Sequence, residues 1–270
     1  MNSKRFGTVL IKGAGDLASG TALRLRRAGF DIVMTEVEKP LAVRRSVCFS
    51  ETVYQNHVQV EDCEAMLAAH AEEALRISRE GKIAVLVDPQ CDCRDQLKAP
   101  VLIDAIMAKR NTGTSRNDAR SVIALGPGFT AGTDCHAVIE TMRGHTLGRV
   151  ITKGGALPNT GVPGEIGGYS VERLLRSPAA GIFRALVSIG DTVQAGDTVA
   201  EVSGLPIQAG IGGVVRGILP SGIEVFKGMK AGDIDPRCKR EHCFTVSDKA
   251  LAVAGGVLEA ILGLSGNFSF

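Results

Sequence analysis

Short apolar runs recur along the first half of the chain, and each is followed by a turn or by a segment with helical spacing. The runs are rich in valine and isoleucine, as buried strands of a parallel sheet are, and they cover residues 8–11, 30–35, 82–87 and 121–125. Helical spacing follows the first run, in TALRLRRAGF, and appears again over Asp62–Arg79. Strands that alternate with helices predict an α/β fold with a parallel sheet.

The first strand leads into the G-x-G-x-x-A turn Gly13-Ala14-Gly15-Asp16-Leu17-Ala18, and then into TALRLRRAGF, which has helical spacing. In this context Gly13 permits a tight turn and Gly15 lets a pyrophosphate approach the backbone, while N–H groups at the helix start favour an anion. Glu36 ends the second strand about 20 residues later, where dinucleotide-binding folds place the acceptor for a ribose hydroxyl. The alternative is a tight turn that binds nothing and an ordinary exposed glutamate.

Two further features are candidates for phosphate binding. Arg44 and Arg45 follow the second strand, and neighbouring guanidinium groups can hold a phosphate or a carboxylate by bidentate hydrogen bonds. A solvated pair of loop side chains is the alternative. Gly126 and Gly128 follow a later apolar strand, and a helix is expected after them over about residues 133–144, so that free N–H groups at a helix start would again favour an anion. A plain turn is the alternative.

Cys91 and Cys93 follow Asp88 at the carboxyl end of the run 82–87, the edge at which open α/β sheets bind ligands. Their spacing differs from the C-x-x-C of zinc ribbons and dithiol redox sites. Two thiols there could carry sulfur or selenium or bind a soft metal. The simpler interpretation is a pair without special reactivity, because Asp88 and Asp92 should raise the thiol pKa values unless Arg94 offsets their charge. The other cysteines and histidines form no recognisable ligand set, so no metal site is expected.

Composition excludes several classes of protein. The 270 residues include 31 basic and 29 acidic side chains, a formal charge of +2, nine phenylalanines, two tyrosines and no tryptophan, which argues against nucleic-acid binding. No apolar segment approaches the roughly 20 residues that a bilayer span requires. Seven cysteines, an odd number in a long chain, do not form a disulfide framework. We therefore expect a cytoplasmic protein with reduced thiols and no membrane partner.

The sequence repeats itself in its last third. The segment from Gly181 aligns with the segment from Gly213 at an offset of 32 residues, which predicts two halves of a small two-fold β sandwich. The pattern resembles the lipoyl and biotinyl hammerhead domains, which have a barrel-sandwich hybrid fold and carry a modified lysine on the hairpin between their halves. Residues 202–208 stand at that hairpin and contain no lysine, so neither lipoate nor biotin is expected.

The remaining segments complete the predicted organisation. The glycine-rich run 153–168 is typical of a hinge or a lid. A helix after Ser247 returns to the α/β body, and its Gly255-Gly256 pair indicates a close backbone contact. The predicted domains are an α/β body over residues 1–176, a β insertion over 177–237 and a C-terminal helix in 238–270.

Taken together, several motifs resemble the YqeB family, the accessory proteins of selenium-dependent molybdenum hydroxylase systems, over essentially the whole chain. These motifs are GAGDLASGTALRL, TEVEKPLAVRRSVCFSETVY, LGPGFTAGTDCHAVIETMRGHTLGRVI, NTGVPGEIGG, GDIDPR and SDKALAVAGGVLEAIL. The resemblance implies a Rossmann-like cytoplasmic protein, related to the XdhC-type chaperones of molybdenum enzymes, that matures or inserts a selenium-containing molybdenum cofactor. It supplies no reaction and no catalytic residue. The candidate cofactor-binding positions that match its motifs are Gly13, Gly15, Asp16, Glu36, Arg44 and Arg45.

Two functions follow as hypotheses. The first is a maturation factor that binds a phosphate-bearing pterin, the molybdenum cofactor or its dinucleotide, and serves a molybdenum hydroxylase client. Its ligand would use Gly13–Gly15 for pyrophosphate, Glu36 for a ribose and Arg44 or Arg45 for a terminal phosphate. The second is an NAD(P)-dependent oxidoreductase that uses the same edge. We favour the first because no histidine or Tyr-x-x-x-Lys pattern supplies a proton donor. Catalysis and homo-oligomerisation stay open.

Overall fold

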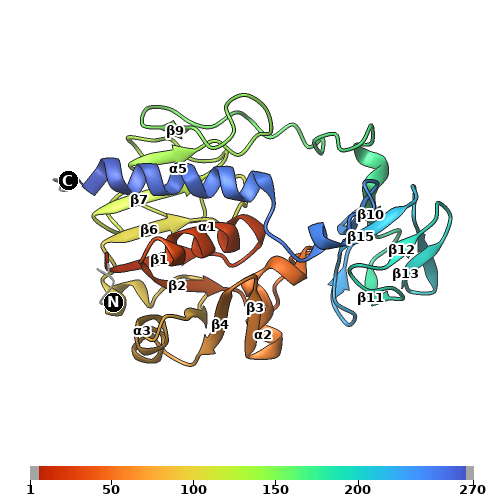
Figure 1. Ribbon diagram of the computed structural model, residues 1–270, viewed down its shortest axis with the longest axis horizontal. Helices are drawn as coiled ribbons and strands as arrows, with labels where there is room; N and C mark the ends of the chain where they lie inside the picture. The colour runs from red at the N-terminus through yellow and green to blue at the C-terminus, as the bar shows by residue number, and fades with distance from the viewer. Residues whose placement is uncertain (1–5, 266–270) are drawn as a thin grey trace. The chain divides into compact units, whose positions relative to one another are not determined.

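The computed structural model describes residues 6–265, which form two compact units (Figure 1). The α/β unit comprises the described residues of Met1–Pro40, Cys48–Asn159 and Val246–Phe270. The β unit comprises Leu41–Val47 and Thr160–Thr245. This division differs from the predicted boundaries after residues 176 and 237. The β unit begins earlier, ends later and includes a short segment from near the start of the chain.

The α/β unit is built on a nine-stranded sheet with the order β3-β4-β5-β2-β1-β6-β7-β8-β9. Its strands are β1 (Thr8–Lys12), β2 (Asp31–Glu36), β3 (His57–Val60), β4 (Cys63–Ala68), β5 (Ile83–Val87), β6 (Val101–Asp104), β7 (Ser121–Leu125), β8 (Ala137–Ile139) and β9 (Val150–Ile151). Pairing is parallel from β4 to β8 and antiparallel at the two edges, where β3 and β9 lie. The predicted α/β class with a large, mainly parallel sheet is confirmed.

The strand order reverses between β1 and β6. From β1 the chain continues to β2 on one side, whereas β6 lies on the other side of β1 and leads to β7. Open α/β sheets bind ligands outside the carboxyl ends of the strands at such a reversal, because the two connections leave in opposite directions and open a crevice. The predicted glycine turn leaves β1 at this position.

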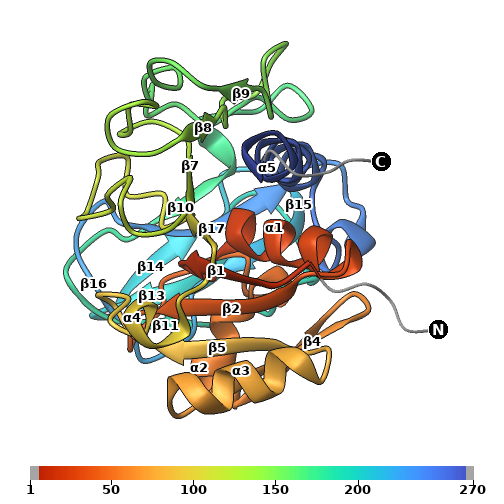
Figure 2. The same ribbon diagram turned by 90° about the vertical axis from the view of Figure 1, so that its left-hand side faces the viewer.

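Helices cover both faces of the sheet. On one face α1 (Asp16–Arg27) and α5 (Asp248–Ser265) lie side by side (Figures 1 and 2). On the other face α3 (Ala71–Arg79) packs on β2, β4 and β5 through Ala71, Ala74 and Ile77. The short helices are α2 (Thr52–Gln55), α4 (Arg94–Leu97) and the 3-10 turns η1 (Arg45–Val47), η2 (Phe49–Glu51), η3 (Val171–Arg173) and η4 (Arg240–Cys243).

Two predicted helices are wrong. Over Asp62–Arg79 only the second half is helical, and the first half is β4, joined to β3 by a tight hairpin with Glu61 in the left-handed region at φ +53. Over residues 133–144 the chain forms β8 instead, which pairs in parallel with β7. In both places a short apolar run fits the spacing of a helix as well as that of a strand, and pairing with a strand that is distant in sequence makes it a strand.

The Gly255-Gly256 pair lies in α5, and the two glycines have different surroundings. A Cβ on Gly256 would lie 2.1 Å from the carbonyl oxygen of Gly148, whereas one on Gly255 would meet only the end of the Arg24 side chain at 3.3 Å. The predicted close backbone contact is therefore confirmed for Gly256.

We expect Gly256→Ala to lower the free energy of unfolding by about 2–3 kcal/mol, because the added methyl group overlaps a backbone oxygen. Gly255→Ala is the matched control, and it should be neutral or stabilise by up to about 1 kcal/mol through helix propensity. Urea denaturation of both variants measures the difference. Equal stability of the two would contradict the close contact.

The β unit contains two four-stranded antiparallel sheets, ordered β10-β17-β15-β12 and β14-β13-β11-β16. Their strands are β10 (Leu174–Arg176), β11 (Gly181–Ala185), β12 (Thr192–Val193), β13 (Thr198–Val202), β14 (Leu205–Gln208), β15 (Gly213–Ile218), β16 (Glu224–Val225) and β17 (Lys230–Asp235). The offset of 32 residues carries β11 onto β15, β12 onto β16 and β13 onto β17, so the predicted repeat of strands is confirmed. Both sheets contribute to one apolar core.

No helix within residues 6–265 combines the length and the apolar character that crossing a membrane would require.

Candidate functional site

The fold requires a glycine at only one of the two glycine positions in the turn after β1. Gly13 adopts φ +90, and a Cβ there would lie 3.1 Å from the carbonyl oxygen of Ala105 and from Cα of Ile106, so the protein itself needs this glycine. Gly15 adopts φ −73, which any residue accepts, and a Cβ there would meet no atom within 4 Å. Neither backbone conformation nor packing requires a glycine at position 15. The space beside it is open to a ligand.

The N-terminus of α1 adjoins this space. Gly15 is the N-cap, and no side chain caps the helix there. The first intrahelical hydrogen bond is donated by Ser19 N to Gly15 O, at 2.8 Å. Amides of a first turn point away from their helix and carry partial positive charge, which suits a phosphate. Asp16 stands in the same turn, where its negative charge also interacts favourably with the helix dipole.

Glu36, the last residue of β2, holds the glycine turn. Its Oε2 accepts a hydrogen bond from Ala14 N at 2.9 Å, and its Oε1 accepts one from Val37 N at 2.8 Å. Burial raises the pKa of Glu36, while these two backbone hydrogen bonds act in the opposite direction. A carboxylate offers about four lone-pair sites, so the oxygens keep capacity for a ribose hydroxyl. The predicted ribose contact stays a prediction.

Phe49 and Ser50, which the sequence analysis did not connect with the site, form hydrogen bonds with the same turn and with the start of α1. Ala14 O accepts hydrogen bonds from Ser50 N at 2.9 Å and from the Ser19 hydroxyl at 3.0 Å, and Ser19 Oγ accepts one from Phe49 N at 2.8 Å. Phe49 and Ser50 are fully buried. Hydrogen bonds within the protein therefore hold both the N–H and the C=O group of Ala14, independently of any ligand.

On the face of the sheet opposite to α1, the ends of β1, β2 and β6 form a buried polar cluster. Lys12 of β1 is paired in register with Thr35 of β2 and with Asp104 of β6, so the three side chains point to the same face. Lys12 Nζ donates to Thr114 Oγ1 at 2.7 Å, and that hydroxyl donates to Asp104 Oδ2 at 2.6 Å. Lys12 and Asp104 also form an ion pair at 3.7 Å. These polar groups lie at the reversal of strand order.

Cys91 and Cys93 lie against this cluster. Asp88 folds their loop by accepting hydrogen bonds from Cys93 N at 2.8 Å and from Asp92 N at 3.0 Å. The pKa of Cys91 is lowered, because the Cys93 thiol donates a hydrogen bond to it and the Lys12 charge supports the thiolate, while burial opposes this. The pKa of Cys93 is raised by its hydrogen bond to Cys91, by burial and by Asp88.

The expectation that nearby carboxylates raise both thiol pKa values is therefore wrong for Cys91. The negative charge of Asp88 does raise the pKa of Cys91, as expected, but it is outweighed by the thiol of Cys93 and by Lys12. Lys12 belongs to a strand that is distant in sequence, so the local pattern around Asp88 contained no sign of it. The expectation holds for Cys93.

Gly126 and Gly128 have a structural explanation. A Cβ on Gly126 would lie 2.6 Å from Thr141 Oγ1, and a Cβ on Gly128 would lie 2.5 Å from the backbone N of Arg110. Both glycines adopt positive φ. The space that each leaves is filled by the protein, and no helix follows them, so the predicted helix N-terminus for an anion is absent from this turn.

Arg44 and Arg45 belong to the β unit. Arg44 is buried and donates hydrogen bonds to the carbonyl oxygens of His242 at 3.3 Å and Thr245 at 3.4 Å. Arg45 Nε donates to Ile218 O at 3.0 Å. Both guanidinium groups therefore hold backbone of the β unit, a role that neither of the two sequence-based interpretations included.

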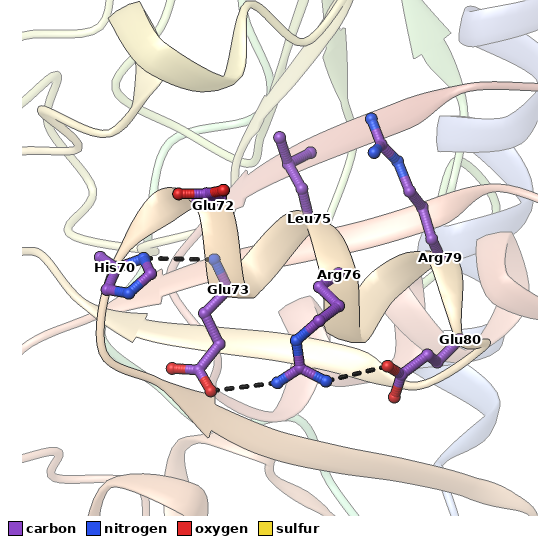
Figure 3. A pocket seen from close by; sticks show the side chains of 7 residues that line it. All are labelled: His70, Glu72, Glu73, Leu75, Arg76, Arg79 and Glu80. Carbon is purple, nitrogen blue, oxygen red and sulfur yellow. Dashed lines mark hydrogen bonds and ion pairs between the residues drawn. The ribbon is translucent and has the colours of Figure 1, made fainter.

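An open depression of about 770 Å³ lies on the outer side of α3 (Figure 3). Three of its charged groups are engaged with one another, since Arg76 pairs with Glu73 at 3.2 Å and with Glu80 at 2.9 Å. The lining comes from α3 and its immediate flanks: His70, Glu72, Glu73, Leu75, Arg76, Arg79 and Glu80. Because a single helix supplies the whole lining and the ion pairs are intrahelical, we assign no function to it.

Within residues 6–265 no group of three or more His, Cys, Asp or Glu side chains is arranged to hold a metal ion.

Comparison with known proteins identifies the family. The uncharacterized protein YqeB of Escherichia coli (strain K12) is 52% identical over 256 residues, which are 95% of this chain. The chain belongs to the YqeB family. It spans about half the length of this relative, 47%, so the match concerns one part of a longer protein. No family model matches the chain.

Solved structures give only weak similarity. An aspartoacylase family protein from Mesorhizobium loti is 12% identical with a TM-score of 0.27, over 86% of this chain and 85% of that one. The apo ectoine utilization protein EutE (DoeB) from Ruegeria pomeroyi is 10% identical with a TM-score of 0.24, over 84% and 87%. At these scores the similarity supports no argument about function.

Proposed function

We propose that this member of the YqeB family is a cytoplasmic accessory protein for the maturation of selenium-dependent molybdenum hydroxylases. Its α/β unit would be a Rossmann-like module that binds the phosphate-bearing part of a molybdenum cofactor or of its dinucleotide. The role in maturation rests on the resemblance of the motifs, since the relative itself is an uncharacterized protein. The binding of a phosphate rests on the geometry of the turn after β1.

The observation that carries the binding proposal is the open position at Gly15. A glycine that neither φ nor packing requires leaves room beside the first turn of α1, and a Cβ would fill that room. The position lies at the carboxyl end of β1, where the strand order reverses. The residues present therefore fit the phosphate part of such a ligand.

In this proposal the residues of the α/β unit have separate roles. Gly15 and the first amides of α1 bind the pyrophosphate oxygens. Glu36 keeps the turn in place through Ala14 N and offers its remaining lone pairs to a ribose hydroxyl. The proposal does not use Arg44, Arg45, Gly126 or Gly128, because carbonyl groups engage the two arginines and protein atoms fill the space beside the two glycines.

Small molecules released from the purified protein test the proposal. Protein made in its native host, denatured and analysed by mass spectrometry, should release a phosphate-bearing pterin, and Gly15→Val protein purified in parallel should release none. Recovery of NAD or NADP in place of a pterin would contradict the proposal and would favour a nicotinamide-dependent oxidoreductase at the same edge.

We further propose that the β unit is a lipoyl/biotinyl-like module, a barrel-sandwich hybrid, without the attached group. Its β13–β14 hairpin turns at Ser203 and Gly204, and the segment 202–208 contains no lysine. We expect the intact mass of protein from its native host to equal the mass of the unmodified chain. A lipoyl or biotinyl increment would contradict this prediction, and peptide mapping would then identify the modified lysine.

A further inference from the structure

Arg216 of β15 is a buried cation whose set of partners is incomplete. The residue is 6% exposed. Its Nη1 lies 3.5 Å from Asp235 Oδ2, which is a long ion pair. Among residues 6–265, which the structure describes, no atom accepts a hydrogen bond from Arg216 Nε. A charged donor that is buried without an acceptor is costly, so such a group in a folded protein calls for an explanation, such as an ordered water or a bound ion.

The two carboxylates whose charges act on Arg216 are bound by other arginines. Arg237 holds both oxygens of Asp235, since its Nε donates to Oδ1 at 2.9 Å and its Nη2 donates to Oδ2 at 2.6 Å. Arg173 Nη1 donates to Asp233 Oδ1 at 2.6 Å. Charge-assisted hydrogen bonds of this length are the strong ones. Three guanidinium groups therefore share two carboxylates, and Arg216 has the weakest contact of the three.

The internal repeat shows how Arg216 differs from its equivalent in the first half. The offset of 32 residues carries Arg184 of β11 onto Arg216 and Glu201 of β13 onto Asp233. Arg184 and Glu201 are paired in register and form an ion pair at 3.3 Å, with Arg184 exposed. In the second half the register shifts within β15, so that Gly217 stands opposite Asp233. Arg216 is thus the extra residue of a β-bulge, a feature that redirects a side chain.

A fourth arginine adds positive charge beside Arg216. Arg44 lies so near β15 that a Cβ on Gly217 would be 3.2 Å from Arg44 Cγ. Burial and the charge of Arg44 lower the pKa of Arg216, while the charge of Asp235 raises it. All of these residues belong to the β unit. An anion beside Arg216 would compensate its charge and accept from its Nε.

These charged side chains reach the surface at the turn that follows β17. Asp235 ends β17, and Cys238 N donates to Asp235 O at 3.3 Å, which closes the turn. The Arg237 side chain is 40% exposed, and Cys238 is exposed as well. Arg216 and Arg237 approach the same atom, Asp235 Oδ2, so Arg216 lies next to an exposed side chain. Exposed side chains change rotamer within nanoseconds, and rotation of Arg237 gives a small anion access to Arg216.

We propose that the β unit binds one oxyanion of the size of inorganic phosphate between Arg216 and Arg237. Arg216 donates to it through Nε, and Arg237 donates from the exposed side. A guanidinium group presents its N–H groups in a planar fork that matches the oxygens of phosphate. The site uses no residue of the contact proposed at Gly15, so it goes beyond the proposed function and does not depend on it.

Calorimetric titration with inorganic phosphate tests the site. The full chain carries Gly15→Val, which removes the phosphate contact proposed after β1, and potassium chloride keeps the ionic strength constant at pH 7. We expect one phosphate to bind per chain. Arg216→Met in this background should weaken binding at least tenfold, because it removes the donor that has no other acceptor. Absence of binding to the Gly15→Val chain, or equal affinity after Arg216→Met, would overturn the proposal.

Two further variants in the same background separate this site from a general effect of charge. Arg184→Met removes the equivalent arginine of the first half and is the matched control, so it should leave the phosphate affinity unchanged. An equal loss in Arg184→Met and Arg216→Met would contradict a specific site. Arg237→Met removes the exposed donor and leaves Asp235 to pair with Arg216, so it should also weaken binding at least tenfold. It tests the same site if Arg216→Met does not fold, and unchanged affinity in Arg237→Met would overturn the proposal as well.

Discussion

Gly15→Val is expected to weaken ligand binding at the turn after β1 at least a hundredfold, which corresponds to about 2.7 kcal/mol, without loosening the fold. The valine side chain would project into the space that the protein leaves open, and phosphate oxygens could no longer approach the backbone. Since φ at this position is −73 and no atom lies within 4 Å of the added Cβ, the folded chain should accept the change. Calorimetric titration with the compound released from the wild-type protein measures the loss, and circular dichroism measures the melting temperature.

Gly13→Ala is the matched control in the same turn. It forces an L side chain into φ +90 and places a Cβ 3.1 Å from the Ala105 carbonyl oxygen, so it should lower the free energy of unfolding by about 1–3 kcal/mol. Substitution of the two glycines of one motif is therefore expected to affect different properties: Gly15→Val lowers the ligand affinity, and Gly13→Ala lowers the stability of the fold. Undiminished affinity in Gly15→Val would show that this turn is structural only.

The elements that the sequence predicted well are those whose signals are local. The run at Thr8–Lys12, the glycine turn and the helix after it lie within a span of about 20 residues, and their order alone indicates a strand, a turn and a helix. The repeat in the β unit was also visible, since its strands begin at equivalent positions such as Gly181 and Gly213. In both cases the residues that make the structure predictable lie within the predicted segment itself.

The failures have a common cause in pairing between distant segments. Met66 and Leu67 fit a helical spacing, but the neighbouring β5 pairs with their segment in parallel and makes it a strand. Ala137–Ile139 joins the sheet beside β7 for the same reason. Arg44 follows β2 in sequence and was a candidate for phosphate binding, with a solvated loop pair as the alternative. Its segment belongs to the β unit, and its guanidinium donates to backbone carbonyl groups there.

The candidate site was only half visible for the same reason. Gly13, Gly15 and Glu36 form a known local pattern, whereas the contact between Lys12 and Thr114 joins residues that are 102 positions apart. The available signal was that two apolar strand runs, TVLIK and VLID, end in opposite charges. Neighbouring parallel strands place their ends at one edge, so this signal would have predicted the Lys12–Asp104 pair once the strand order was known.

Removing Asp104 is expected to destabilise the α/β unit more than any other single change at the site. Lys12 and Asp104 are both almost fully buried and form an ion pair at 3.7 Å, with Thr114 between them. Asp104→Ala leaves the Lys12 ammonium buried without its partner, and breaking a buried pair in this way costs about 3–5 kcal/mol. Urea denaturation should show the loss as a lower midpoint.

Thr114→Val and the double variant Lys12→Met with Asp104→Leu separate the charge from the hydrogen bonds. Thr114→Val keeps both charges and removes one hydroxyl, so it should cost about 1–2 kcal/mol. The double variant removes both charges and should recover most of the stability that Asp104→Ala loses, because replacing a buried pair by apolar side chains is often neutral. If the double variant is as unstable as Asp104→Ala, the loss comes from packing at the ends of β1 and β6, and the uncompensated charge of Lys12 is not its cause.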